Sequence, residues 1–397
     1  MTDHLGLTAE QDALLDLVRE VAAREIAPHA AQWEHDSVFP RDVFTALGKA
    51  GLLGLVYPEQ YGGGAQPFRV YLMALEELAR ALLSVGVGAS VQTLTVFAFS
   101  AFGTEEQRAR WMPPALAGEW IGSYCLSEPG SGSDAASLVA RAARDGDAYV
   151  LNGTKAWVTH GGSSDYYIVF ARTGDAGAKG ISAFFVPSTT SGLVAAKLED
   201  KMGLRSSPTA QITLDDVRVP ADHLIGEEGV GFRIAMEALD GGRLGIAACS
   251  VGLAQAALDA ALAFARERKQ FGTPVAQFQG ISFMLADLAT QIEAARALTL
   301  DAAARRDAGA PYSTQAAMSK LFASDTAMRV TTDAVQVLGG YGYIREYPVE
   351  KWMRDAKIYQ IWEGTSEIQR LVISRAISGE RRPLTREQPK PQIRKAS

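Results

Sequence analysis

The spacing of apolar residues predicts that the first third of the chain is helical. From Leu14 onward, apolar residues recur three or four positions apart, which is typical of an amphipathic helix. Thr8 and Gln11 have the spacing of a capping box, so this helix should begin just after Thr8. Further helices are expected over residues 40–53, 70–83 and 104–116.

The pattern changes at about Ile121, where Val-, Ile-, Phe- and Thr-rich segments bounded by Gly, Pro or Asp predict strands. The Asn152-Gly153 pair interrupts the first of these segments and predicts a hairpin turn. Strands are expected on both sides of that turn within residues 148–159, and then over residues 165–173, 181–188 and 210–220.

Long helices return from about Gly231, and they are Ala-rich with broad apolar faces. Such faces are wider than one bundle normally buries, which indicates self-association. Ser366 and Gln369 have the form of a second capping box, so a last helix should begin there. The long helices are expected over residues 251–268, 279–306 and 314–338.

This order predicts an α+β fold that is mainly α. We expect an N-terminal helical domain over residues 1–120, a middle β domain over residues 121–232 and a C-terminal helical domain over residues 233–380. Residues 381–397 are rich in Pro, Lys and Arg and are expected to form a flexible tail.

Charge and composition narrow the class of protein. The 397 residues carry a net charge of −6, so no overall positive field would attract nucleic acid or an anionic membrane. We expect neither a transmembrane segment nor a signal peptide, and therefore a cytoplasmic protein. Cys125 and Cys249 lie in apolar or small-residue surroundings without a CxxC motif, as expected for buried free thiols in a reducing compartment. The five histidines lack ligand spacing, which argues against a metal site.

Glu363 is the first candidate for chemistry, because it follows a run of apolar residues and lies between Trp362 and Gly364. Most glutamates at such a position are solvated loop residues. A carboxylate beside a large aromatic side chain and before a helix is also a candidate base with a raised pKa.

A second motif is misleading. Gly130, Gly132 and Ala135 match the dinucleotide-binding fingerprint by letter. That fingerprint works only between a strand and a helix of a parallel βαβ unit, and here a β hairpin is expected to follow. We therefore exclude nicotinamide binding.

Five motifs in order resemble the acyl-CoA dehydrogenases: "YCLSEPGSGSDAAS", "KAWVT", "RKQFG", "QVLGGYGY" and "MRDAKIYQIWEGTSEIQRLVISR". The resemblance covers residues 8–380. It implies a helical domain, a middle β-barrel-like domain and a C-terminal four-helix-bundle domain. It also implies a homotetramer with one FAD per subunit and electron transfer to an electron-transferring flavoprotein.

The reaction implied by the resemblance is α,β-dehydrogenation of an acyl-CoA to the trans-2-enoyl-CoA. Glu363 falls on the position of the base that removes the α-proton, while the β-hydrogen leaves as hydride to flavin N5. A minority of the family carries its base immediately before a substrate-binding arginine, but here Gly242 precedes Arg243, so Glu363 is the expected base. This "GGR" form resembles short-chain and short branched-chain members.

The resemblance also implies the cofactor contacts. Tyr124, Leu126 and Ser127 lie on the strand that resembles the family's isoalloxazine-binding strand, and Trp157 is expected beside the ring. The alternative role for Trp157 is ordinary packing in the core. Arg268 suits the pyrophosphate, unless it is an ordinary surface arginine of a charge run. The FAD contacts are expected to be Tyr124, Leu126, Ser127, Ser133, Trp157, Thr159, Arg268, Phe271, Gln279, Gln336, Gly339, Gly340, Thr365, Ser366 and Glu367.

Ser133, Asp240, Arg243 and Gly364 match substrate-contact positions of the family, and Asp134 is expected to be a structural turn residue. Two departures affect the interpretation. His160 stands where members usually carry Asn, and Trp362 replaces a frequent Tyr, so that its bulk bears on acyl chain length.

Three alternatives stay open at this point. A flavin monooxygenase or oxidase can share this fold, although such relatives generally lack the glutamate. A dehydrogenase of acyl groups bound to a carrier protein would use the same chemistry. A catalytically silent helical scaffold would bind no flavin. The acyl chain, the pathway and the physiological electron acceptor are not determined by the sequence.

Overall fold

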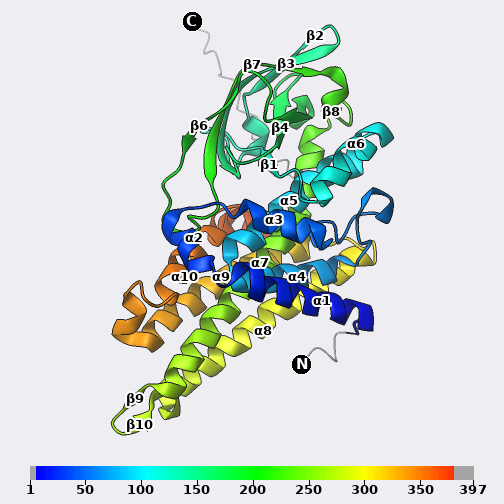
Figure 1. Ribbon diagram of the computed structural model, residues 1–397. Coiled ribbons are helices and arrows are strands. Elements are labelled where there is room, and N and C mark those ends of the chain that lie inside the picture. The colour runs from blue at the N-terminus through cyan, green and yellow to red at the C-terminus, as the bar shows by residue number, and fades with distance from the viewer. Residues whose placement is uncertain (1–5, 380–397) are drawn as a thin grey trace, which may run out of the picture.

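The structure is a computed structural model in which residues 6–379 are described. A curved mixed sheet lies at one end of the molecule, and a layered group of helices forms the other end (Figure 1). The order of helices, strands and helices along the chain confirms the predicted α+β, mainly α fold. The tail expected over residues 381–397 lies outside the described residues.

From residue 6 onward, where the structure describes the chain, six α-helices precede the sheet. The capping box at Thr8 is present, since its hydroxyl accepts from the Gln11 backbone N–H at 3.2 Å. The predicted helices over residues 40–53, 70–83 and 104–116 are all found, with small differences at their ends. The helices are α1 (Ala9–Val21), α2 (Ala30–Asp36), α3 (Arg41–Lys49), α4 (Phe68–Ala81), α5 (Leu83–Phe102) and α6 (Glu105–Leu116).

Helix α5 was not expected, because it is apolar on almost every side and shows no amphipathic period. Its length and composition would suit a membrane span, as would those of α7 (Gly231–Glu267). In the most apolar stretch of each helix, however, 78% and 72% of the residues are buried inside the fold. Both helices therefore have the burial of core helices.

The sheet has eight strands in the order β6-β7-β3-β2-β4-β5-β8, with β1 paired to β4. β1 runs parallel to β4, and the neighbouring pairs β4–β5, β2–β3 and β3–β7 are antiparallel. The strands are β1 (Gly122–Cys125), β2 (Arg141–Asp145), β3 (Ala148–Thr159), β4 (Tyr166–Arg172), β5 (Ile181–Pro187), β6 (Leu193–Leu198), β7 (Thr209–Pro220) and β8 (Leu224–Ile225).

The hairpin predicted at Asn152-Gly153 is wrong. β3 runs unbroken through this pair, and the turn lies earlier, between Asp145 and Ala148. The register against β7 shifts between Leu151 and Gly153, so the pair forms a bulge. Gly153 has φ +146, which explains why the same two residue types suit a bulge as well as a turn.

Long helices follow the sheet. α7 packs against α4, α5, α8 and α9, and Figure 1 shows α7 and α8 extending together to a small hairpin at their far end. That hairpin consists of β9 (Lys269–Gln270) and β10 (Thr273–Pro274). The other helices are α8 (Gln279–Asp307), α9 (Ser313–Leu338), α10 (Val349–Ala356) and α11 (Ser366–Ser378).

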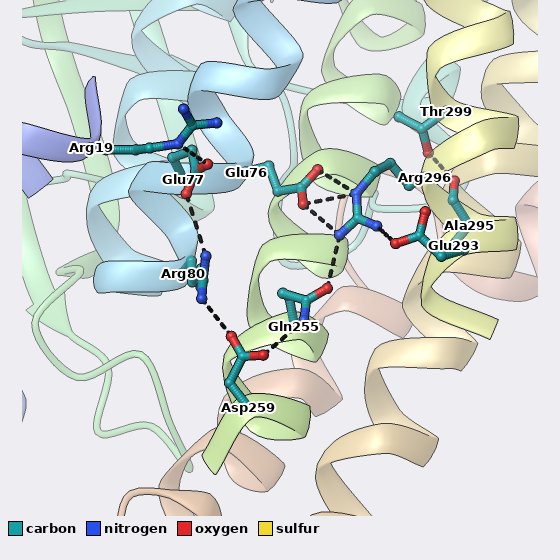
Figure 2. Close-up of polar contacts among 10 residues, drawn as sticks. All are labelled: Arg19, Glu76, Glu77, Arg80, Gln255, Asp259, Glu293, Ala295, Arg296 and Thr299. Carbon is teal, nitrogen blue, oxygen red and sulfur yellow. Dashed lines mark hydrogen bonds and ion pairs between the residues drawn. The ribbon is translucent and has the colours of Figure 1, made fainter. Parts of the chain in front are cut away.

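A chain of polar contacts ties α1, α4, α7 and α8 together (Figure 2). The Arg296 guanidinium of α8 donates to Glu76 of α4 at 2.7 Å and to Gln255 of α7 at 3.0 Å. Arg80 of α4 donates to Asp259 of α7 at 2.6 Å. Because these contacts join three helices that carry or support the site described below, they restrict sliding of the helices past one another.

A second polar junction connects the sheet to both helical parts. Glu34 of α2 accepts from the backbone N–H of Arg205 at 3.0 Å and from that of Ser206 at 3.2 Å. Asp355 of α10 accepts from the backbone N–H of Leu204 at 2.7 Å and lies 2.5 Å from the Lys351 ammonium. One loop of the sheet is therefore held by carboxylates from both ends of the chain.

Candidate active site

Glu363 lies on a tight turn between a 3₁₀ segment (Lys357–Gln360) and α11. Glu363 has φ +48 and Gly364 has φ +88. A positive φ is strained for a non-glycine residue, and such strain often marks functional sites. The predicted capping box at Ser366 and Gln369 is wrong: Thr365 is the N-cap, and its hydroxyl accepts from the Ile368 N–H. This was hard to foresee because Thr365 and Ser366 are both good N-cap residues.

The Gln369 side chain instead folds back onto the turn. Its Nε2 lies 2.8 Å from the Gly364 carbonyl and 3.3 Å from the Glu363 carbonyl. The ammonium of Lys320, from α9, donates to the same Gly364 carbonyl at 2.8 Å. Two buried side chains from different helices thus hold the strained turn in place.

The Glu363 carboxyl group points at α7. Its Oε2 is buried and has no hydrogen-bond partner among the described residues. A Cβ on Gly242 would lie 2.3 Å from this oxygen, so any larger residue there would displace the carboxyl group from this position. Burial raises the pKa of Glu363 to about 7, although the positive charges of Lys320 and Arg243 act to lower it. The carboxyl group therefore titrates where a general base is most useful.

Buried polar atoms without a partner gather around this carboxyl group. Such atoms are normally hydrogen-bonded, so a concentration of them in one place indicates a ligand site. Within residues 6–379 they include Arg243 Nε, Trp362 Nε1, Glu363 Oε2, Ser366 Oγ and Gln369 Oε1.

A small cavity begins beside Gly242. It lies between α4, α5 and α7, and its wall is largely aromatic and aliphatic. Trp362 is not among the lining residues, and its ring packs instead against Tyr359 with the centroids 5.1 Å apart. The lining residues are Tyr57, Phe68, Tyr71, Ser90, Thr93, Leu94, Phe97, Glu237, Ala238, Gly241, Gly242 and Arg306.

Three of the four predicted substrate contacts surround the turn. Arg243 lies 2.5 Å from Asp240, and Asp240 also accepts from the Ser313 hydroxyl at 3.0 Å. Gly364 follows Glu363 directly. Ser133 is exposed on the loop after β1, and the neighbouring Asp134 accepts through its carbonyl from two serine hydroxyls, as expected for a turn residue.

The predicted isoalloxazine contacts lie together at the ends of β1 and β3. The Ala156 N–H donates to the Ser127 carbonyl at 2.9 Å, which places Trp157 beside Leu126 and Ser127. A bulge in β3 gives Trp157 φ +61 and turns its side chain out, 65% exposed. The hydroxyls of Ser127 and Thr159 have no partner among the described residues. An exposed indole beside two unengaged hydroxyls fits a flat, polar-edged ring system such as a flavin.

Tyr124 connects this strand with the glutamate. Its hydroxyl lies 3.4 Å from the Ala235 carbonyl of α7. Burial raises the pKa of the Tyr124 phenol, and the nearby Glu363 charge raises it further. The end of β1 and the turn at Glu363 therefore face one region of space.

His160 does not face this region. It is buried between Phe39 and Phe44, with its Nδ1 3.2 Å from the Gly122 carbonyl. Burial lowers the pKa of His160 to about 4, so the ring is neutral at ordinary pH. It serves as a packing residue between α3 and the sheet.

A separate groove lies at the far end of α7. It has a volume of about 660 Å³ and includes Arg268, Phe271, Gly339 and Gly340. Arg268 stacks over the Tyr341 ring at 5.5 Å, and Phe271 is 96% exposed with φ +50. At a rise of 1.5 Å per residue, this groove is about 37 Å along the helix from Arg243.

The remaining predicted cofactor residues divide between these two places. Gln279 and Gln336 are exposed near the groove but do not line it. Thr365, Ser366 and Glu367 begin α11 beside the glutamate turn. One chain therefore carries two distinct sets of predicted cofactor contacts.

Two buried lysines were missed by the sequence interpretation. Lys320 supports the glutamate turn, and Lys155 lies 2.7 Å from Glu128 with both side chains buried. Glu128 also accepts from the N–H groups of Val139 and Ala140, so it holds the loop after β1. The sequence pattern could have pointed to Lys320, because this lysine lies in an Ala-rich apolar stripe of α9, where a lysine is unusual.

With the fold and this geometry in place, comparison with known proteins defines the class. Models of the acyl-CoA dehydrogenase N-terminal, middle and C-terminal domains match residues 8–119, 123–217 and 229–378. The chain therefore belongs to the acyl-CoA dehydrogenase family, whose members are flavoprotein oxidoreductases.

Individual relatives agree over nearly the whole chain. The "Acyl-CoA dehydrogenase, short-chain specific" of Clostridium acetobutylicum is 44% identical over 371 residues, covering 93% of this chain and 98% of the relative. The butyryl-CoA dehydrogenase structure from Megasphaera elsdenii has a TM-score of 0.92 at 43% identity, covering 94% and 99% of the two chains. A structure described as the electron transferring flavoprotein of Acidaminococcus fermentans has a TM-score of 0.93 at 44% identity, covering 94% and 99%.

Proposed function

We propose that this protein is an FAD-dependent dehydrogenase of short-chain or short branched-chain acyl-CoA, with Glu363 as the base. The observation that carries the proposal is the buried, unpartnered Glu363 Oε2 at the start of a small cavity. The product is the trans-2-enoyl-CoA, and for a straight-chain substrate this is the first step of fatty acid β-oxidation. Similarity to short-chain and butyryl-CoA dehydrogenases supports the substrate class.

Glu363 removes a proton from the carbon next to the thioester carbonyl. This proton is weakly acidic, so the negative charge that develops on the carbonyl oxygen needs a donor. The backbone N–H of Glu363 makes no hydrogen bond within the described residues and is available as that donor. A carboxyl group with a pKa of about 7 is ionised in useful amounts at neutral pH and is a stronger base than an ordinary glutamate.

FAD, when bound, supplies the acceptor for the hydride that leaves the β-carbon. The residues that would hold its ring system are Tyr124, Leu126, Ser127, Trp157 and Thr159. Asp240 and Arg243 form a partly buried ion pair beside the turn and would orient the thioester end of the substrate. Ser133 and the first residues of α11 complete the proposed FAD and CoA contacts.

The proposed preference for short acyl groups follows from the cavity beside Gly242. Phe68, Leu94 and Phe97 line its wall, and bulky walls oppose long chains. Because one methylene contributes only about 1 kcal/mol of discrimination, the preference should decline gradually with length.

We further propose that the active form is a homotetramer. The groove around Arg268 is about 37 Å along α7 from Arg243, so one chain forms two separate parts of a cofactor site. An exposed aromatic residue such as Phe271 suits an interface with another copy of the chain. In this arrangement the residues that would contact the ADP half of FAD held by a neighbouring subunit are Arg268, Phe271, Gln279, Gln336, Gly339 and Gly340.

Electrons then pass to an electron-transferring flavoprotein. This partner is supported by the similarity to a chain in the Acidaminococcus fermentans structure. The two buried free cysteines, Cys125 and Cys249, fit the reducing environment of the cytoplasm.

An anaerobic titration tests the proposal. The purified protein is mixed with butyryl-, isobutyryl-, isovaleryl- and octanoyl-CoA, and loss of the visible flavin absorbance is followed. We expect bleaching by four- or five-carbon substrates. In Glu363→Gln, which keeps the size and the backbone N–H, FAD and acyl-CoA still bind but reduction slows by several orders of magnitude. Colourless protein, or unchanged bleaching in the variant, contradicts the proposal.

A further inference from the structure

The ammonium of Lys320 is buried in an unusual setting. Its side chain is fully buried on α9, and its Nζ donates to the Gly364 carbonyl at 2.8 Å. Within residues 6–379, no carboxylate lies within ion-pair distance of Nζ. A buried charge without an ion-pair partner costs stability, so a lysine retained here calls for a role that an apolar residue could not fill.

Lys320 differs in this respect from the other cation beside the glutamate. Arg243 is paired with Asp240 at 2.5 Å, and its charge is therefore largely balanced. The charge of Lys320 has no such partner, and its strongest electrostatic interaction is with Glu363. Glu363 is thus the group that its charge chiefly affects.

The hydrogen bond of Lys320 also has a structural consequence. Its acceptor, the Gly364 carbonyl, belongs to a turn with two successive residues at positive φ. Such a turn persists only when its surroundings hold it. Gln369 holds it from α11, and Lys320 holds it from α9.

We propose that Lys320 is a positioning residue for Glu363, because its ammonium holds the Gly364 carbonyl of the turn that carries Glu363 and places a positive charge next to that residue. This inference rests on the proposed role of Glu363 as the base. Lys320 is not among the residues proposed to hold substrate or cofactor, and it acts through the glutamate turn.

Other charged groups lie around Glu363 and Lys320 and also act electrostatically on them. Arg243 from α7 acts on both Glu363 and Lys320, and Asp325 from α9 and Glu367 from α11 act on Lys320. Asp325 is engaged by Gln360 and Arg370, and Glu367 is exposed. Tyr124, Cys249 and Tyr359 also face Glu363, and all three have raised pKa values, so they are neutral near pH 7.

Three substitutions separate the two parts of the proposal. Lys320→Met removes both the charge and the hydrogen bond, Lys320→Gln keeps a donor without charge, and Lys320→Arg keeps the charge. The measurement is the rate of flavin reduction by butyryl-CoA across pH, with the FAD content of each variant determined first.

We expect the pH midpoint of reduction to rise by about one unit or more in Lys320→Met and Lys320→Gln, because the opposite charge beside the carboxylate is gone. Lys320→Arg should keep the wild-type midpoint. The plateau rate at high pH should fall more in Lys320→Met than in Lys320→Gln, since only the former loses the donor to Gly364.

A second readout needs no turnover. The stability that Glu363 contributes, measured as the difference in unfolding free energy between wild type and Glu363→Gln, is lost as pH rises. This loss should occur at higher pH when both proteins also carry Lys320→Gln. If Lys320→Met does not fold, the comparison of Gln with Arg still decides, because both can donate but only Arg is charged. A wild-type midpoint in all folded variants overturns the inference. Absence of bleaching in the wild type instead contradicts the proposed function itself.

Discussion

Gly242 and Glu363 face one another across the site so closely that a methyl group on Gly242 would lie 2.3 Å from the Glu363 Oε2. The two residues are far apart in sequence, and each constrains the other. The carboxyl group can occupy its buried position only because α7 presents no side chain there.

The first prediction concerns this contact. Gly242→Ala should slow flavin reduction by roughly 100-fold, since the displaced carboxylate loses its alignment with the substrate. Gly241→Ala is the matched comparison on the same helix, because its Cβ would face the same cavity but would meet Arg306 at 3.0 Å and Phe68 at 3.8 Å instead of Glu363. Reduction rates of the two holoenzymes, measured side by side, check the prediction. Equal rates would mean that Oε2 is not held against Gly242.

The second prediction concerns pH and catalysis. Burial raises the pKa of Glu363 to about 7, and a base must be deprotonated to accept a proton. The rate of reduction by butyryl-CoA should therefore rise with pH through about 7 and then level off. Stopped-flow measurements from acid to alkaline pH test this. A rate that is flat across neutral pH would contradict a raised pKa.

The third prediction concerns pH and stability. The pKa of Glu363 in the folded chain is higher than the ordinary value of about 4.3 expected in the unfolded chain. The Glu363 side chain therefore makes its full contribution to the free energy of unfolding at pH values below about 4.3. The contribution is lost as pH rises through about 7. Between pH values of about 5.5 and 8.5, wild type should lose about 2 kcal/mol relative to Glu363→Gln. Denaturant unfolding of both proteins measures the difference, and the opposite sign would refute the raised pKa.

The fourth prediction concerns acyl chain length. Phe97 lines the cavity beside Gly242, whereas Trp362 does not. In wild type, octanoyl-CoA should have a kcat/KM at least about tenfold below that of butyryl-CoA, and Phe97→Ala should narrow this gap. Trp362→Tyr serves as the comparison and should change the ratio little. If the Trp362 variant alone widens the range of substrates, the indole is the controlling group.

The fifth prediction concerns assembly. If Arg268 and Gln336 reach FAD across a subunit boundary, dilution that separates the subunits must release the cofactor. Sizing runs at falling concentration, with protein and flavin absorbance recorded together, test this. Excess free FAD should shift the equilibrium back toward the larger species. A stable monomer that stays fully yellow would be incompatible with a shared site.

The pattern of residues predicted the order of elements well, because long amphipathic helices and strands bounded by glycine and proline have strong local signals. The prediction was wrong where the same residues suit two different local structures. Asn152 and Gly153 suit a hairpin turn and a bulge equally, and only pairing with β7 decides between them. Helix α5 was overlooked because it is buried on nearly all sides and has no polar face.

The candidate site was predicted in part. Glu363, Gly364 and Arg243 lie together as expected, and the residues predicted to contact the isoalloxazine ring share one end of the sheet. The side chains that shape the site from a distance were not foreseen. Lys320 is separated from Gly364 by more than forty positions, and its contact depends on how α9 packs against α11. Such pairings follow from tertiary packing and have no local signature.

Because α7 is one unbroken helix, it fixes the distance and the rotation between its two ends. This one helix carries Arg243 beside the glutamate and ends at Arg268 beside the distant groove. Deleting or inserting a single residue between them would rotate one end by about 100° and shift it by about 1.5 Å relative to the other. Substitutions along the exposed side of α7 should therefore be tolerated during evolution, whereas changes in its length should be eliminated.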